Sequence, residues 1–141
     1  MPPNTILAPE IDYLYTALSS INDAGQGLFT AIKIYKDEII SVYTGELLSN
    51  KESIKRAERQ ENQYFITLLS GKTLDSKHTP GFAKYANDAH PSLFKNNAKI
   101  ALNDKNQVCL IATKNIAQYT EILTSYGKAY WLAQSIVNNQ K

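Results

Sequence analysis

Two glycines flank a single residue in the segment Gly25-Gln26-Gly27, and this pair is the first feature of the sequence that could serve a ligand. Glycine reaches backbone angles that other residues avoid and lets the main chain come close to another group. A dinucleotide-binding fingerprint needs a third glycine and a helix directly afterwards, whereas residues 28–32 have the composition of a strand. The loop therefore either approaches a ligand of another kind or is a plain turn.

The cysteine and histidine content excludes several kinds of catalytic site. Cys109 is the single cysteine and lies in an apolar run, residues 108–111, which is typical of an inert buried thiol. A disulfide within the chain is therefore impossible. The two histidines, His78 and His90, form no Cys/His set at zinc-ligand spacing, and no carboxylate cluster replaces it. We expect no metal.

The length and composition indicate one globular domain. A chain of 141 residues fits a single core, and 43% hydrophobic residues with 20% charged residues argue against extended disorder. The formal net charge of +2 is too small to predict a surface that follows nucleic-acid phosphates. The start of the sequence carries neither a basic segment nor a continuous apolar stretch, so we expect no membrane partner and an intracellular protein, cytoplasmic or nuclear.

Short strands separated by turns are the elements that would position these residues, and the predicted fold is mainly β with short helices. The strand-like runs are residues 13–19, 28–34, 39–43, 64–69, 73–75, 97–102 and 108–113. The first two runs flank a glycine-containing turn at residues 22–27. Polar connections predict three hairpins, formed by 28–34 with 39–43, 64–69 with 73–75, and 97–102 with 108–113.

Two segments have helical signals. Ser49 or Asn50 can cap a short exposed helix within residues 49–62, and Glu52 stands three residues after Ser49 as in a capping box. Residues 128–137 follow Gly127 and place apolar side chains near helical spacing, which predicts a second helix.

Four segments that are ambiguous alone form an ordered series along the chain. They are Gly25-Gln26-Gly27-Leu28-Phe29, Tyr43-Thr44-Gly45-Glu46, Lys84-Tyr85-Ala86-Asn87-Asp88-Ala89 and Glu121-Ile122-Leu123-Thr124-Ser125-Tyr126-Gly127. The series resembles the SET domain of protein lysine methyltransferases and covers roughly residues 12–131. The resemblance implies a single SET domain over residues 1–141, with several small sheets in a β-clip fold and a knot-like C-terminal arrangement.

The resemblance also implies a cofactor and a site. The cofactor would be S-adenosylmethionine, which leaves as S-adenosylhomocysteine. Tyr126 matches the catalytic tyrosine of the family, and Trp131 would cover the adenine ring, because the cysteine-rich segment of many relatives is missing here. The implied cofactor-binding residues are Gly25, Gln26, Gly27, Lys84, Asn87, Asp88, Tyr126 and Trp131. The implied substrate-binding residues are Tyr43, Tyr85 and Thr124.

Two positions depart from the pattern of the family. Asp88 stands where relatives often have histidine, which puts a carboxylate near the positive groups of the cofactor. Thr124 stands where relatives often have an aromatic residue that limits the number of methyl groups. The smaller side chain predicts room for more than one methyl group.

The implied partner is a protein or peptide that bears the target lysine, with a histone among the candidates. It would enter as an extended strand beside residues 49–62 and the C-terminal tail. A homodimer is one option for the oligomeric state. The missing zinc-binding cysteines resemble compact SET proteins of viruses and intracellular bacteria, which suggests action on host chromatin.

Two alternatives stay open at this point. The first is a catalytically inactive SET fold that binds a peptide or S-adenosylmethionine, if Asp88 and Thr124 have dismantled the reaction centre. The second is a structural, β-rich interaction domain whose motif matches are coincidental.

Overall fold

The computed structural model of the chain describes residues 5–61, 64–67, 72–90, 92–105 and 107–125. The elements in this part of the chain are short and mostly strands. They are α1 (Glu10–Tyr13), β1 (Leu14–Leu18), β2 (Gln26–Thr30), β3 (Ile39–Val42), β4 (Glu46–Leu48), α2 (Asn50–Glu58), β5 (Phe65–Thr67), β6 (Thr73–Asp75), the 3-10 helix η1 (Ala83–Tyr85), β7 (Ala98–Leu102), β8 (Val108–Ala112) and β9 (Glu121–Ile122).

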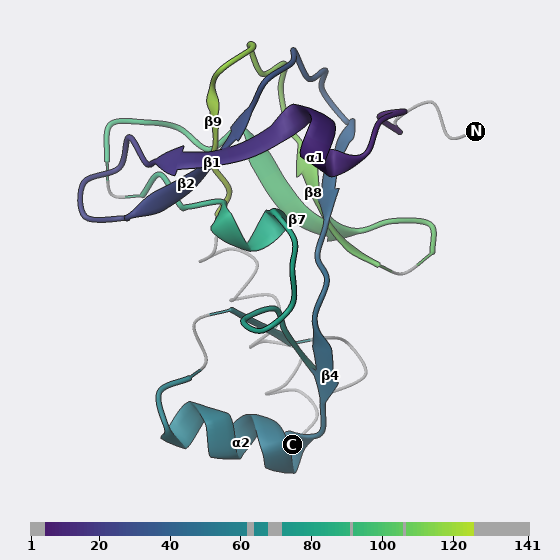
Figure 1. Cartoon of the computed structure of the whole chain (residues 1–141), viewed down its shortest axis with the longest axis vertical. Helices are drawn as coiled ribbons and strands as arrows, with labels where there is room; N and C mark the ends of the chain where they lie inside the picture. The colour runs from purple at the N-terminus through teal and green to yellow at the C-terminus, as the bar shows by residue number, and fades with distance from the viewer. Residues whose placement is uncertain (1–4, 62–63, 68–71, 91, 106, 126–141) are drawn as a thin grey trace.

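The strands form three small antiparallel sheets. The strand orders are β1-β2-β9, β3-β8-β7 and β4-β6-β5. The first two sheets lie in the upper part of Figure 1 with α1 and η1, and β4 lies in the lower part with α2. The prediction of a mainly β fold built from several small sheets is confirmed.

One hydrophobic core joins the elements of the two upper sheets. Its fully buried members come from strands and connections that are far apart in the sequence, because short strands bury enough apolar surface only by packing together. They include Leu28, Ile34, Ile40, Leu110, Ile116 and Ile122, each at most 2% exposed. Leu74 of β6 belongs to the same core cluster, so the third sheet also contributes to it.

Two of the predicted hairpins are confirmed. β5 pairs with β6 through Phe65 opposite Asp75, and β7 pairs with β8 through Ala98 opposite Ala112. In the second hairpin, Asn103 Oδ1 accepts hydrogen bonds from Lys105 N and from Gln107 N, each at 2.9 Å. An asparagine side chain that bonds the following backbone is a common turn device, and it explains why this hairpin can be read from the sequence.

The hairpin predicted from residues 28–34 and 39–43 is wrong. β2 pairs with β1 and β9, whereas β3 pairs with β8, so the two runs belong to different sheets. The chain separates after Thr30, and Ile34 makes an isolated antiparallel bridge with Ile116. Both runs bury apolar side chains in the shared core, and pairing with distant strands allows this burial for each of them.

The elements near the glycine pair also differ in their bounds. Gln26 and Gly27 belong to β2, although the sequence predicts that they end a turn. Tyr13 ends the short helix α1, which the sequence does not predict, and β1 begins one residue later. The Tyr13 hydroxyl donates to Ile40 O at 2.7 Å, and this contact anchors α1 to β3.

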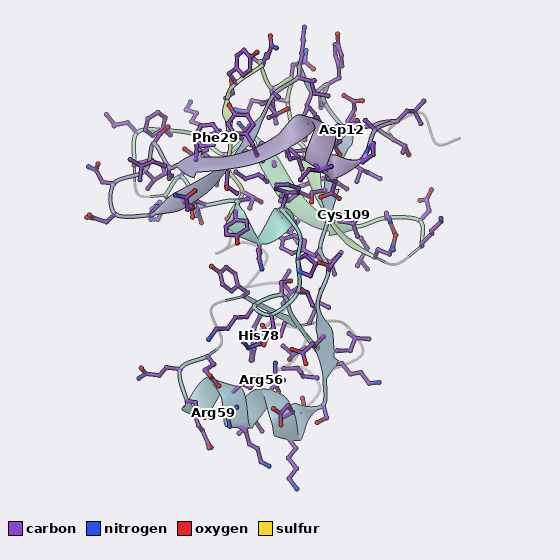
Figure 2. The ribbon with its side chains drawn as sticks, viewed as in Figure 1. Asp12, Phe29, Arg56, Arg59, His78 and Cys109 are labelled. Atoms are coloured by element: carbon purple, nitrogen blue, oxygen red, sulfur yellow. The ribbon has the colours of Figure 1, made fainter. Side chains whose placement is uncertain are left out.

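The exposed helix predicted within residues 49–62 is confirmed as α2. Ser49 caps it, because Ser49 Oγ accepts a hydrogen bond from Glu52 N at 3.2 Å. The guanidinium of Arg56 donates to three carboxylates, those of Glu46, Glu52 and Asp75. Asp75 is fully buried, and Figure 2 shows Arg56 between α2 and the chain above it, so Arg56 attaches the helix to the β4-β6-β5 sheet.

The helix predicted for residues 128–137 lies outside the described residues. Of the described helices, α2 is the longest with nine residues, which is far shorter than a membrane span requires.

Candidate functional site

The glycine pair lies on the hairpin of β1 and β2. Ser19 N donates to Gly25 O at 2.8 Å and closes the loop between the strands. Gly25 has a φ angle of 70°, which few residues other than glycine adopt without strain. The loop is thus closed beside Gln26, whose backbone oxygen is directed toward Asn87.

Asn87 connects this loop to the C-terminal part of the chain. Its side-chain nitrogen Nδ2 donates to Gln26 O at 3.0 Å, and its backbone oxygen accepts from Thr124 N at 2.8 Å. Asn87 also forms an isolated parallel bridge with Leu123. Three segments that are distant in the sequence therefore converge on one place.

The segment 121–125 is held from its other side by Asn97. The Asn97 amide donates to Glu121 O at 3.0 Å and accepts from Leu123 N at 2.9 Å. Leu123 O accepts from the backbone of both Asn97 and Ala98. The segment thus runs between Asn87 and the start of β7, which fixes the position from which the chain enters Tyr126.

Glu121 also reaches the glycine loop through its side chain. Glu121 is 5% exposed, its Oε2 accepts from Ser19 Oγ at 2.6 Å, and its Oε1 accepts from Ser20 N at 2.7 Å. Sequence reasoning missed Glu121 and Asn97. Glu121 lies in the fourth family segment, but its contacts span about a hundred positions of sequence, and Asn97 lies outside the four segments.

Lys84 has its ammonium group engaged with a neighbouring loop. Lys84 Nζ donates to Ser76 O at 3.1 Å and to Thr79 O at 2.8 Å. The same nitrogen lies over the rings of Tyr85 and Tyr64, at 5.4 and 5.8 Å from their centroids. Lys84 therefore ties η1 to the connection that follows β6, and its assignment to the cofactor stays a prediction.

Asp88 shapes the loop that follows Asn87. Its Oδ1 accepts from His90 N at 2.9 Å and from Asn96 Nδ2 at 3.2 Å, and the side chain is half-buried. Asn96 Oδ1 in turn accepts from Ala89 N at 2.9 Å. This carboxylate thus has an internal structural use, and a direct role toward a cofactor stays a prediction.

The residues expected to line the substrate channel are buried to different degrees. Tyr43 is 8% exposed and Tyr85 is half-buried against the core. The residue after Tyr43 is fastened to the 76–81 connection, because Thr44 Oγ1 donates to Pro80 O and Thr44 O accepts from Thr79 Oγ1 at 2.9 Å.

Thr124 is fully buried, and its hydroxyl has no hydrogen-bond partner among the described residues. Tyr126 and Trp131 lie outside the described residues, so the roles expected for them stay predictions. Ser125, the last residue described, places the chain directly before Tyr126.

Metal-ligating side chains do not cluster in the described part of the chain, where no group of three or more His, Cys, Asp or Glu residues could hold an ion.

Comparison with known proteins explains this convergence. Residues 25–127, which are most of the chain, match the SET domain family. The chain belongs to the SET domain family. A coincidental match of motifs, one of the alternatives left open by the sequence, is thereby excluded.

The relatives of this SET domain are larger proteins. It is 24% identical over 134 residues to the histone-lysine N-methyltransferase SUV39H1 of Xenopus laevis, covering 89% of this chain and 32% of the relative. It is 31% identical over 120 residues to the histone-lysine N-methyltransferase EZH2 of Chaetomium thermophilum, covering 77% of this chain and 8% of the relative. The chain thus spans about a third of the first relative and less than a tenth of the second.

Solved structures have the same fold over most of the SET domain. The Polycomb Repressive Complex 2 of Chaetomium thermophilum, in an autoinhibited conformation bound to S-adenosylmethionine, matches with a TM-score of 0.72 and 26% identity, covering 91% of this chain and 17% of that one. A humanized mutant of this complex bound to the inhibitor GSK343 matches with a TM-score of 0.72 and 27% identity, covering 82% of this chain and 15% of that one.

Proposed function

We propose that this SET domain is a protein-lysine N-methyltransferase that uses S-adenosylmethionine. The observation that carries the proposal is the hydrogen bond from Asn87 to Gln26, because it joins the two segments to which the family resemblance assigns cofactor binding. Family membership, the activity named for the relatives and the S-adenosylmethionine bound in a structural neighbour at 26% identity support the same activity.

The described residues fit the cofactor at two points. A Cβ placed on Gly25 would meet no described atom within 4 Å, so the described residues leave room for a ligand beside the loop. The amide nitrogen of Asn87 is used by Gln26, which leaves its side-chain oxygen as an acceptor for an ammonium or hydroxyl group. When bound, the cofactor would supply a methyl group on a positively charged sulfur.

The protein would have to provide a neutral amine and hold it in place. A lysine amine with an ordinary pKa of about 10.4 is almost wholly protonated at neutral pH and has no lone pair for attack. An apolar channel lined by Tyr43 and Tyr85 would remove water and lower the pKa of the amine, because desolvation disfavours its charge. A dedicated base is then unnecessary.

Positioning would supply most of the acceleration. The transfer is an in-line displacement, in which amine, methyl carbon and sulfur have to be close to collinear. We assign Tyr126 to the junction of the two sites, with its phenol oxygen facing the reacting groups. Its position directly after the segment held by Asn87 and Asn97 supports this assignment. The remaining site assignments are Lys84, Asp88 and Trp131 toward the cofactor, and Thr124 toward the number of methyl groups.

We further propose that residues 1–141 act as one domain on a lysine of a protein partner, with histones as the first candidates. The core shared by all three sheets supports a single domain, and the names of the relatives support a histone. An intracellular location, action in a host cell and a homodimer stay predictions.

One assay tests the proposed activity. The purified chain is incubated with methyl-labelled S-adenosylmethionine and either core histones or a cell extract, and modified lysines are identified by mass spectrometry. Labelled lysine is the expected result. Cofactor binding in calorimetry without label in either protein source would replace the proposal by the inactive binding module. Absence of cofactor binding would overturn the proposed activity and leave only the module that binds a peptide.

A further inference from the structure

The two glycines assigned to the cofactor, Gly25 in the loop between β1 and β2 and Gly27 at the start of β2, have different surroundings. The segment that contains them is called the cofactor loop below. Gly25 has a positive φ of 70°, and a Cβ placed on it would meet nothing within 4 Å among the described residues. A Cβ on Gly27 would lie 2.3 Å from Glu121 Oε2, 3.0 Å from Glu121 Cδ and 3.2 Å from Ser19 Cα. Position 25 therefore requires glycine because of its positive φ angle. Position 27 requires glycine because Glu121 leaves no room for a side chain.

Glu121 occupies this space in a fixed position. It is opposite Phe29 in the β2–β9 ladder, so Gly27 is its diagonal neighbour on the same face of the sheet. Its two carboxylate oxygens accept hydrogen bonds from Ser19 Oγ and Ser20 N, and Ser19 Oγ also accepts from Ile21 N at 3.1 Å. A side chain with both oxygens engaged and only 5% exposed cannot move aside cheaply.

We propose that Glu121 is a positioning residue of the cofactor loop, and that its carboxylate is the reason for glycine at position 27. The carboxylate reaches across the glycine to hold the start of the loop at Ser19 and Ser20. Because Glu121 belongs to the segment that leads into Tyr126, it fixes the loop relative to the strand that enters the reaction centre. The inference rests on the proposed function, since the loop is assigned to S-adenosylmethionine.

The alternative explanation of Gly27 makes a different prediction. If glycine were needed so that the cofactor can approach the backbone, a methyl group at position 27 would lower the affinity for S-adenosylmethionine with any residue at position 121. If Glu121 is the reason for the glycine, the loss of affinity caused by Gly27→Ala becomes smaller when the carboxylate is removed.

A double-mutant cycle on S-adenosylmethionine affinity separates the two explanations. We expect Gly27→Ala to weaken binding about tenfold or more in the parent, because overpacking displaces the carboxylate. In a Glu121→Ala background, the same change should cost less than about threefold, since only the contact with Ser19 Cα remains tight. Equal losses in both backgrounds would overturn the inference.

Two variants serve as controls for the cycle. Gly25→Ala strains a positive φ without contacting Glu121, so its loss of affinity should be the same in both backgrounds. Glu121→Gln keeps an oxygen for Ser20 N and offers an amide to Ser19 Oγ, and it should retain most of the affinity that Glu121→Ala loses. A positioning role also predicts that Glu121→Ala raises KM for the cofactor while kcat changes little, and a fall in kcat alone would contradict it.

Measurements without cofactor keep failure of the inference distinct from failure of the proposed function. Glu121→Ala should speed hydrogen exchange at the Ser20 amide, whose acceptor is lost, and unchanged exchange would overturn the inference. If Gly27→Ala unfolds the protein, the double variant with Glu121→Ala should restore the melting temperature. Failure to restore it would also overturn the inference. A parent protein that binds no S-adenosylmethionine would refute the proposed function. Hydrogen exchange at Ser20 and the melting temperature of the double variant would still test the role of Glu121.

Discussion

Asn87 donates a hydrogen bond from its side-chain amide to Gln26 O, 3.0 Å away, and the two residues are 61 positions apart in the sequence. The backbone oxygen of Asn87 accepts from Thr124 N on its other side. Asn87 thus holds the glycine loop and the C-terminal segment together before any ligand is bound. Preorganisation of this kind lowers the entropic cost of binding.

Replacing Asn87 with alanine should therefore weaken cofactor binding. The variant loses the hydrogen bond to the loop and the acceptor assigned to the cofactor, and each hydrogen bond contributes about 0.5–1.5 kcal/mol. We expect the Kd for S-adenosylmethionine in calorimetry to rise about tenfold. Asn115→Ala is the control, because the side chain of exposed Asn115 also bonds the backbone, with its Oδ1 accepting from Lys36 N outside the site. Equal affinity of parent and Asn87→Ala would refute the assignment.

Arg56 offers a prediction on stability. It is the ion-pair partner of the fully buried Asp75, and Arg56→Met would leave this carboxylate without its positive neighbour in a dry environment. We expect a clear fall in the urea midpoint of unfolding. Arg59→Met at the C-cap of the same helix is the control, since Arg59 is 58% exposed and pairs only with Glu61 among the described residues. An exposed pair contributes little, so a similar loss in both variants would contradict the role of Arg56.

Arg56 also has a consequence at acid pH, through its ion pair with Glu46. Hydrogen bonds from Arg56 hold the pKa of Glu46 below its ordinary value of 4.5. A carboxylate with a lowered pKa in the folded state stabilises the protein above its unfolded pKa, and this contribution is lost as the pH falls below about 4.5. In urea titrations between pH 7 and pH 3, Arg56→Met should therefore lose less stability on acidification than the parent protein. An identical acid dependence would exclude the coupling.

Local signals explain which elements could be predicted from the sequence. The cap at Ser49 and the turn at Asn103 act within a few residues, so α2 and the β7–β8 hairpin could be predicted. The pairing of β2 with β9 and of β3 with β8 could not, because these partners lie far along the chain. Strand propensity indicates that a run is extended, but the shared core decides which strand it joins.

The same distinction between local signals and distant contacts applies to the candidate site. The family motifs identified Gly25, Gln26 and Asn87, and the structure brings these residues together. Glu121 lies inside a motif as well, but its function in the loop depends on side-chain contacts with Ser19 and Ser20 that no spacing reveals. Asn97 lies outside the motifs and was missed for the same reason.

Tyr13 should make the protein less stable at alkaline pH. Burial is the main cause that raises the pKa of its phenol above the ordinary value of 10.0, and the nearby Glu10 and Glu38 add to it. The folded state then keeps a proton that the unfolded state loses, so this contribution is complete below pH 10 and is lost as the pH rises above it.

Tyr13→Phe tests this prediction in urea titrations at pH 7 and pH 10.5. The variant should lose about 1 kcal/mol at pH 7, because the hydrogen bond to Ile40 O is removed. Its stability should then fall less between the two pH values than that of the parent. Tyr119→Phe, at a residue that is 66% exposed, should retain the dependence of the parent. A parallel fall in Tyr13→Phe and the parent would show that another group is responsible.

Tyr126→Phe separates catalysis from folding most directly. The change removes a phenol oxygen and keeps the ring, so the melting temperature and the affinity for S-adenosylmethionine should stay close to those of the parent. If the oxygen acts as a positioner and electrostatic partner of the transferring methyl group, kcat should fall about a hundredfold or more, as for other single groups aimed at a transition state. Tyr119→Phe should keep full turnover, since it is exposed and lies on the connection before β9. Near-normal turnover of purified Tyr126→Phe would remove Tyr126 from the reaction centre and leave the methyl transfer to other groups of the site.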